Sequence, residues 1–102
     1  IQVFDPQGRF LLKWGIRGNG DGEFSQPQGL AIDSEGNVYV SEYGNSRIQV
    51  FDPRGRFLRK WGSEGNGDGE FSQPQGLAID SEGDVYVSDQ GNHRILVFKP
   101  TV

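Results

Sequence analysis

The chain is built on an internal repeat of 47 residues, and this repeat constrains its fold more than any other feature. Residues 1–47 and 48–94 align without a gap, and residues 95–102 begin a third copy. Repeats of this length are typical of solenoids and propellers, in which each copy is one structural unit that packs against the next. The 102 residues therefore form one repeat array rather than separate domains. The two complete copies differ at eight positions: Gln7/Arg54, Leu12/Arg59, Ile16/Ser63, Arg17/Glu64, Asn37/Asp84, Glu42/Asp89, Tyr43/Gln90 and Ser46/His93.

Each copy carries the signals of four short antiparallel strands. Apolar runs at 29–33 and 37–41 flank three turn residues that end in glycine, which predicts a hairpin. The runs at 47–51 and 56–61 flank the sequence Asp-Pro-Arg-Gly, in which proline and glycine suit the positions of a tight turn. The polar, glycine-rich stretch 62–75 is expected to be a loop, and no helical periodicity is present.

Four short antiparallel strands in one such period correspond to one blade of a β-propeller. Apolar side chains occupy both faces of the predicted sheet, since Leu30 and Ile32 point to one face and Ala31 to the other. A sheet that packs between two neighbours needs this pattern, whereas a half-solvated sheet alternates more cleanly between apolar and polar residues. The predicted fold is therefore an all-β propeller with four-stranded antiparallel blades, about two blades per chain.

Composition excludes several classes of protein. The chain has no cysteine, so it cannot form disulfides, thiolate metal sites or a cysteine nucleophile. Ten basic residues against 14 acidic residues give a net charge of −4, so no nucleic-acid partner is expected. No apolar run is long enough for a membrane helix, and no membrane partner is expected. The basic cluster on the fourth strand is attributed to the solubility of an outer edge strand: Arg54, Arg56, Arg59 and Lys60.

Three separated segments resemble the NHL repeat, a propeller family named for an Asn-His-Leu signature. They are Pro27–Asp33, Gly36–Val40 and Asn45–Phe51, and the second copy contains Asn92-His93-Arg94-Ile95 with arginine in place of the signature leucine. The resemblance covers essentially the whole chain. It implies a six-bladed ring in a family whose members mostly bind proteins, RNA or small ligands, with a few lyases among them.

Two blades cannot close a ring, so the sequence predicts that the chain assembles with copies of itself. Three chains of two blades would give the six blades that the resemblance implies, and four chains would give eight. The strand at 9–14 of one chain could complete the last blade of another. The strands at 1–4 and 95–98 would then compete for one position, and one of them must be displaced. The sequence does not say which.

Four features are candidates for chemistry, and for each we favour a structural explanation. The loops 18–23 and 65–70 superficially resemble calcium loops, but glycine occupies two ligand positions, so flexible connectors are expected. The single histidine, His93, cannot form a metal centre alone. An arginine before each third strand (Arg47, Arg94) is expected to form a fork with Glu42 or Asp89. Turn capping is expected of Asp33 and Asp80.

The activity expected on these grounds is assembly into a closed symmetric ring without catalysis, by a propeller fragment or an engineered repeat protein. The alternative is a module that binds a peptide or a small polar ligand at the channel mouth. An RNA binder and an NHL-type lyase rank below both, and no metal or other cofactor is expected. The residues predicted to line the channel mouth are Gln26, Gln28, Tyr43, Gln73, Gln75, Gln90 and His93.

Overall fold

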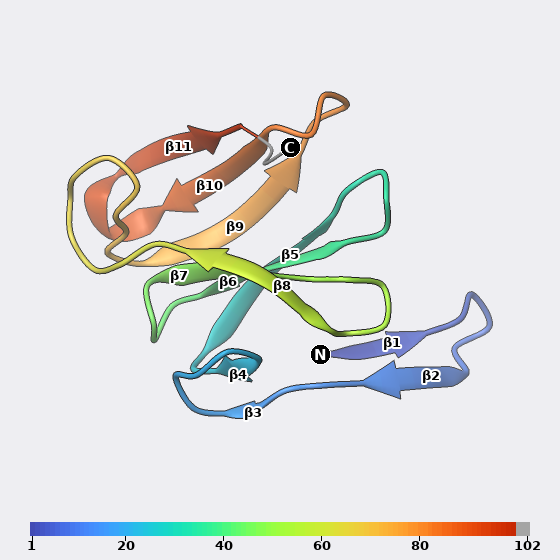
Figure 1. Cartoon of the computed structure of the whole chain (residues 1–102). Helices are drawn as coiled ribbons and strands as arrows, with labels where there is room; N and C mark the ends of the chain where they lie inside the picture. The colour runs from blue at the N-terminus through green and yellow to red at the C-terminus, as the bar shows by residue number, and fades with distance from the viewer. Residues whose placement is uncertain (100–102) are drawn as a thin grey trace.

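The first complete set of four strands forms an antiparallel sheet, which we call the first blade. In the computed structural model, which describes residues 1–99, strands β5, β6, β7 and β8 lie side by side in chain order (Figure 1). The predicted strand ranges are confirmed to within two residues at each end. The observed bounds are Pro27–Ile32, Val38–Glu42, Arg47–Phe51 and Phe57–Trp61.

The two central strands of the first blade are buried along their whole length. Val38 and Val40 face one side of the sheet, while Tyr39, Ile48 and Val50 face the other. Each side has its own apolar cluster, because the blade lies between two other layers of the chain. The prediction that both faces of a blade are apolar is confirmed here.

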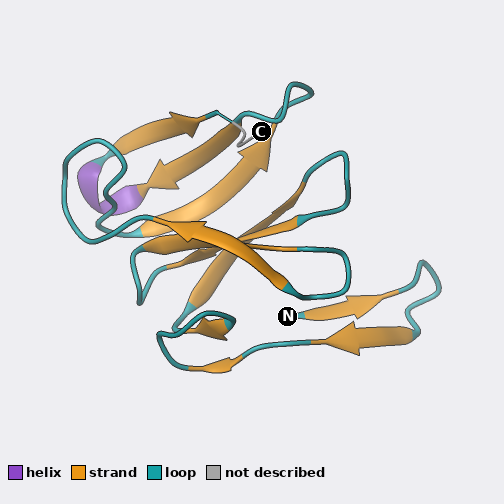
Figure 2. Cartoon of the chain, in the orientation of Figure 1, coloured by secondary structure: helices purple, strands orange, loops and turns teal. Residues whose placement is uncertain are grey.

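The second blade contains strands β9, β10 and β11, which form a three-stranded antiparallel sheet. A single 3-10 turn, η1 (Gln90–Asn92), joins its last two strands and is the purple element of Figure 2. The three strands of the second blade have the bounds Pro74–Ile79 for β9, Val85–Asp89 for β10 and Arg94–Phe98 for β11.

In the part of the chain that the structure describes, no helix is long and apolar enough to cross a membrane. Residues 100–102, the end of the partial third copy, lie outside the described residues.

The N-terminal residues form a separate hairpin of β1 (Gln2–Phe4) and β2 (Phe10–Lys13), which correspond to the third and fourth strands of a copy. This N-terminal hairpin packs on the first blade through Trp14, whose ring lies 5.5 Å from that of Phe51. In the same way, Trp61 of β8 lies 5.4 Å from Phe98 of the second blade. The hairpin therefore occupies the position beside the first blade that β7 and β8 occupy beside the second.

The two terminal strands that were predicted to compete both keep a place within one chain. Strand β1 pairs with β2, and β11 pairs with β10, so the two strands belong to different sheets (Figure 1). A conflict arises only if a second copy brings its hairpin to the open edge of β11.

The connectors between copies were expected to be loops, but each contains a short stretch of strand pairing. In the first connector, β3 (Ile16–Arg17) pairs in parallel with β4 (Glu23–Phe24), and the second connector has the corresponding bridge between Glu64 and Phe71. The prediction of an unpaired loop is wrong for these short segments. They pair because each connector folds back on itself, with the Gly18 N–H donating to the Phe24 carbonyl at 2.9 Å.

The contact between the two blades, the intrachain junction, leaves the far face of the second blade uncovered, while the N-terminal hairpin covers part of the far face of the first. Tyr39, Ile48 and Val50 of the first blade pack at the junction against an apolar set of the second blade that includes Val85 and Val87. The far side of the second blade, which we call the C-terminal face, exposes Tyr86, Ile95 and Val97. These are the repeat counterparts of Tyr39, Ile48 and Val50. On the far side of the first blade, the N-terminal face exposes Leu30 and Ile32.

Candidate functional site

A buried ion pair joins β6 and β7 of the first blade. Arg47 Nε donates to Glu42 Oε2 at 2.6 Å, and Arg47 Nη2 donates to Glu42 Oε1 at 3.2 Å. Gln49 Nε2 donates to the same carboxylate at 2.7 Å. The Arg47 side chain is 8% exposed and that of Glu42 is fully buried. The predicted fork between strands is confirmed, and its hydrogen bonds offset the cost of burying two charges.

The same arginine holds the glycine-rich connector in place. Arg47 Nη1 donates to the Asn19 carbonyl at 2.9 Å, and Nη2 donates to the Gly20 and Glu23 carbonyls at 3.0 and 2.7 Å. A calcium site would use such carbonyl oxygens as ligands, but here they already accept protein donors. The segment is a connector, as expected, and these bonds fasten it to the blade.

Sequence reasoning missed Gln49, which links the connector to the strand. Its Oε1 accepts from the Gly22 N–H at 3.0 Å, and its Nε2 also donates to the Glu23 carbonyl at 2.8 Å. The side chain is fully buried. A polar residue in an otherwise apolar strand was the available signal, since buried amides need partners for their donors and acceptor.

The second blade has a looser version of this network. Arg94 Nε lies 3.4 Å from Asp89 Oδ2, Arg94 is 26% exposed, and Leu96 stands where the first blade has Gln49. Burial opposes the ionisation of Asp89, but donors that include the Gln73 N–H outweigh it and hold the pKa of Asp89 below its ordinary value. The fork predicted for Arg94 is thus a single long contact, because aspartate is one methylene shorter than glutamate.

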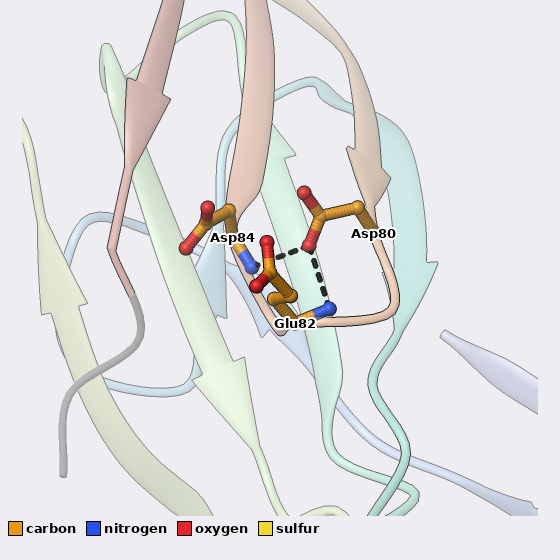
Figure 3. Close-up of side chains that lie close together, drawn as sticks. All are labelled: Asp80, Glu82 and Asp84. Atoms are coloured by element: carbon orange, nitrogen blue, oxygen red, sulfur yellow. Dashed lines mark hydrogen bonds between the residues drawn. The ribbon is translucent and has the colours of Figure 1, made fainter.

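The aspartates at the end of the inner strands cap the turns that follow them. Asp80 Oδ1 accepts from the N–H groups of Glu82 and Asp84 at 2.9 and 3.0 Å (Figure 3). Asp33 makes the same two contacts with Glu35 and Asn37, at 2.9 Å each. The prediction of turn capping is confirmed at both positions.

The second of these turns also brings three carboxylates together. The side chains of Asp80, Glu82 and Asp84 place oxygens within 4.8 Å of one another (Figure 3). The Asp80 carboxylate, with smaller effects of burial and the other two carboxylates, raises the pKa of Tyr86, whose hydroxyl donates to Asp80 Oδ2 at 3.3 Å. Asp80 and Glu82 are exposed or nearly so, and the cluster is accounted for by the turn.

Four of the predicted ligand-binding residues, Gln26, Tyr43, Gln73 and Gln90, take part in contacts within the protein. Gln73 Nε2 donates to the Tyr43 hydroxyl at 2.8 Å across the intrachain junction. The Gln26 carbonyl accepts from the Tyr43 N–H, and the Gln73 carbonyl accepts from the Gln90 N–H, each at 3.0 Å. These bonds tie the loop before each inner strand to the loop after the second strand.

Three of the predicted residues, Gln75, Gln90 and His93, line one open hollow of about 470 Å³ on the C-terminal face. Gln26 lines a separate hollow of about 720 Å³, so the predicted set does not form a single site, and Gln28 is simply exposed. His93 is exposed and has a left-handed backbone with φ of 55°. Ligand binding by these residues stays a prediction.

The cations of the fourth strand of the first blade have local partners. Arg56 Nε lies 2.8 Å from Asp52, and Lys60 Nζ lies 2.7 Å from Asp21. Arg59 donates to the Tyr39 hydroxyl at 2.9 Å, with its guanidinium 5.7 Å from the centre of the ring. The contacts of Arg59 join β8 to β6 within the first blade.

The intrachain junction also contains a main-chain contact between the two inner strands. Ser41 Oγ accepts from the Gly29 N–H at 2.8 Å and donates to the Gln75 carbonyl at 2.7 Å. A Cβ atom on Gly29 would lie closer to that carbonyl oxygen than van der Waals contact allows. Strand β9 of the second blade thus lies directly against β5 and β6 of the first.

Comparison with known proteins supports the same fold. The chain is similar to the solved structure of a gluconolactonase from Xanthomonas campestris, with 23% identity and a TM-score of 0.58. The match covers 98% of this chain and 34% of the gluconolactonase, so the chain spans about a third of that protein. No curated protein matches the sequence.

The family comparison identifies the repeat itself. The NHL repeat profile matches residues 24–51 and 71–98, which together make up more than half of the chain. Each match begins in the connector at Phe24 or Phe71 and ends at the last residue of the third strand, Phe51 or Phe98. With two family matches on two propeller blades, the chain belongs to the NHL-repeat family.

Proposed function

We propose that this chain is a non-enzymatic assembly unit, whose C-terminal face binds the N-terminal face of another copy to close a symmetric ring of blades. One observation carries the proposal: residues that are buried at the intrachain junction have exposed counterparts on the C-terminal face. The N-terminal face of another copy is the repeat counterpart of the surface that covers these residues within the molecule.

The difference in exposure between the copies is large. Tyr39, Ile48 and Val50 are 2%, 0% and 0% exposed, whereas their counterparts on the C-terminal face are 40%, 61% and 54% exposed. The exposed counterparts are Tyr86, Ile95 and Val97. Exposed apolar clusters of this kind mark contact surfaces, because burying them removes apolar area from water.

The N-terminal face also exposes apolar residues whose repeat counterparts are packed in the intrachain junction. Leu77 and Ile79 of the second blade pack into the intrachain junction, while the corresponding Leu30 and Ile32 are 55% and 66% exposed. The N-terminal hairpin already lies where the outer half of a preceding blade belongs. The three-stranded sheet of another copy would supply the three inner strands of that blade, so its β11 and the β1 of this chain meet at one position.

A closed ring needs a whole number of chains. The contact between a C-terminal face and an N-terminal face is head-to-tail, and such contacts either close into a ring or continue as an open fibre. Three chains of two blades give the six blades that the family resemblance implies, so we propose a trimer. Catalysis is not part of the proposal, since the likeness to the gluconolactonase is one of fold alone.

The mass of the chain in solution tests this function. Sedimentation equilibrium or light scattering over a range of concentrations should give three times the 11.3 kDa of one chain. A mass of four chains would keep the assembly function but change the ring to eight blades. A stable monomer at all concentrations would overturn the proposal, and so would mass that grows without limit as an open fibre forms.

A further inference from the structure

The two blades come close together at Gly29 and Ser41, which lie against the main chain of β9. The Ser41 hydroxyl bridges the blades, since it accepts from Gly29 of its own sheet and donates to the Gln75 carbonyl of the next. The bond fixes the two inner strands in one position relative to each other, because a hydroxyl has only one proton to donate.

Gly29 is required at this contact for lack of space. A Cβ atom there would overlap the Gln75 carbonyl oxygen and would lie 2.9 Å from Ser41 Oγ and 3.2 Å from the Leu77 nitrogen. Two of these three atoms belong to the main chain of the neighbouring blade, which cannot move aside as a flexible side chain would. An alanine at position 29 would therefore push the blades apart.

The second blade has the same pair of residues in the same arrangement, but with nothing against it. Ser88 Oγ accepts from the Gly76 N–H at 2.8 Å, as Ser41 does from Gly29. Among the described residues, the Ser88 hydroxyl has no acceptor for its proton. A Cβ atom on Gly76 would meet only Ser88 Oγ, at 3.2 Å, so no other blade restricts this position within one chain.

We propose that Gly76 and Ser88 are the main-chain contact between copies, with the Ser88 hydroxyl donating to the Gln28 carbonyl of a second copy. Gln28 holds the place in the first blade that Gln75 holds in the second, and its strand β5 is exposed at this point. The inference rests on the proposed assembly and names the residues that set the distance between two chains. It also means that the hollow beside Gln75 is filled by β5 of the second copy.

The matched pair of variants Gly76→Ala and Gly29→Ala tests this inference. Neither glycine has a positive φ, so alanine is tolerated by the backbone at both positions. In Gly76→Ala, we expect the circular dichroism and thermal unfolding of the diluted single chain to be unchanged, while light scattering shows loss of the assembly. In Gly29→Ala, we expect the thermal unfolding of the single chain itself to occur at a lower temperature.

A second pair of variants, in which serine is replaced by alanine, removes only a hydroxyl. It tests the same contact if an alanine at position 76 impairs folding. Ser88→Ala should weaken each contact between chains about five-fold, the effect of one lost hydrogen bond. Ser41→Ala should instead destabilise the single chain. If the unmodified chain assembles and both Gly76→Ala and Ser88→Ala assemble equally well, this inference is wrong while the proposed function stands. If the unmodified chain stays monomeric, both are wrong.

Discussion

At the scale of single residues, the two copies show how one substitution changes a buried network. Gln49 completes the hydrogen bonds of Glu42 and of the Gly22 N–H, whereas Leu96 at the corresponding position cannot form them. The change of Glu42 to Asp89 accompanies the change of Gln49 to Leu96. Arg94 still donates to three carbonyls of the second connector at 2.8 to 2.9 Å, so the second connector differs in lacking the bonds that Gln49 makes in the first.

Replacing Gln49 with leucine tests the value of this network. Gln49→Leu should lower the free energy of unfolding by about 2 kcal/mol, because a buried N–H loses its acceptor and a buried carboxylate loses a donor. Urea denaturation of the two proteins measures the difference. The same change at the exposed Gln2, which has the same position in its copy, should shift stability by less than about 0.5 kcal/mol. An equal effect at both positions would contradict this account.

At the scale of elements, the turn between the third and fourth strands does more than reverse the chain. Asp52 caps the turn by accepting from the Arg54 and Arg56 N–H groups at 2.9 Å each, and Asp5 caps the turn of the N-terminal hairpin in the same way. The first-blade turn also supports the N-terminal hairpin, because Gly55 lies directly against the ring of Trp14.

A comparison of alanine substitutions at two glycines in these turns distinguishes the effect of backbone strain from the effect of packing. Gly8 and Gly55 both have φ of 85°, but a Cβ atom on Gly8 would meet nothing within 4 Å, whereas on Gly55 it would lie 2.7 Å from the Trp14 ring. Gly8→Ala should cost about 1 kcal/mol from strain alone.

Gly55→Ala should cost more than Gly8→Ala, since it must also displace Trp14. It should release the N-terminal hairpin to limited proteolysis and shift the tryptophan fluorescence toward that of exposed indole. Equal stability of the two variants, with the hairpin equally protected, would show that Trp14 does not depend on this turn.

Much of the element structure was predictable from the sequence, because it depends on local patterns. Alternating apolar residues and Asp-Pro-x-Gly turns predict the strands of the first blade to within two residues. The short pairings within the connectors and the role of Arg47 in holding them were not predictable. Arg47 reaches carbonyl groups more than 20 residues away in the chain, and no local pattern reports such contacts. The paired connector segments are only two residues long, too short to show a strand pattern.

At the scale of the whole molecule, the two terminal strands differ in how well they are held. Strand β11 pairs with β10 from Arg94 to Phe98, and Phe98 packs against Trp61 and Phe71 with ring distances of 5.4 and 5.8 Å. Strand β1 is shorter, and its Phe4 is 52% exposed. In a ring, we expect β11 to keep its position and β1 of the next copy to leave, so that β2 pairs with β11.

Two truncations distinguish the terminal strands. Deletion of residues 1–4 should leave the assembly intact by light scattering, because the displaced strand contributes little to it. Deletion of residues 95–102 should abolish assembly, since it removes half of the C-terminal face. The reverse result, with the C-terminal deletion assembling and the N-terminal deletion monomeric, would assign the closing position to β1.

The sequence by itself determined the repeat, the four strands of each copy and the family, because these follow from local periodicity and turn chemistry. Only the tertiary structure decided that identical residues have different surroundings in the two copies. Gly29 and Gly76 carry the same sequence context, yet one touches a neighbouring blade and the other is open. Burial depends on which segments pack together. The second blade covers Gly29 of the first blade, whereas no part of the same chain covers Gly76 of the second.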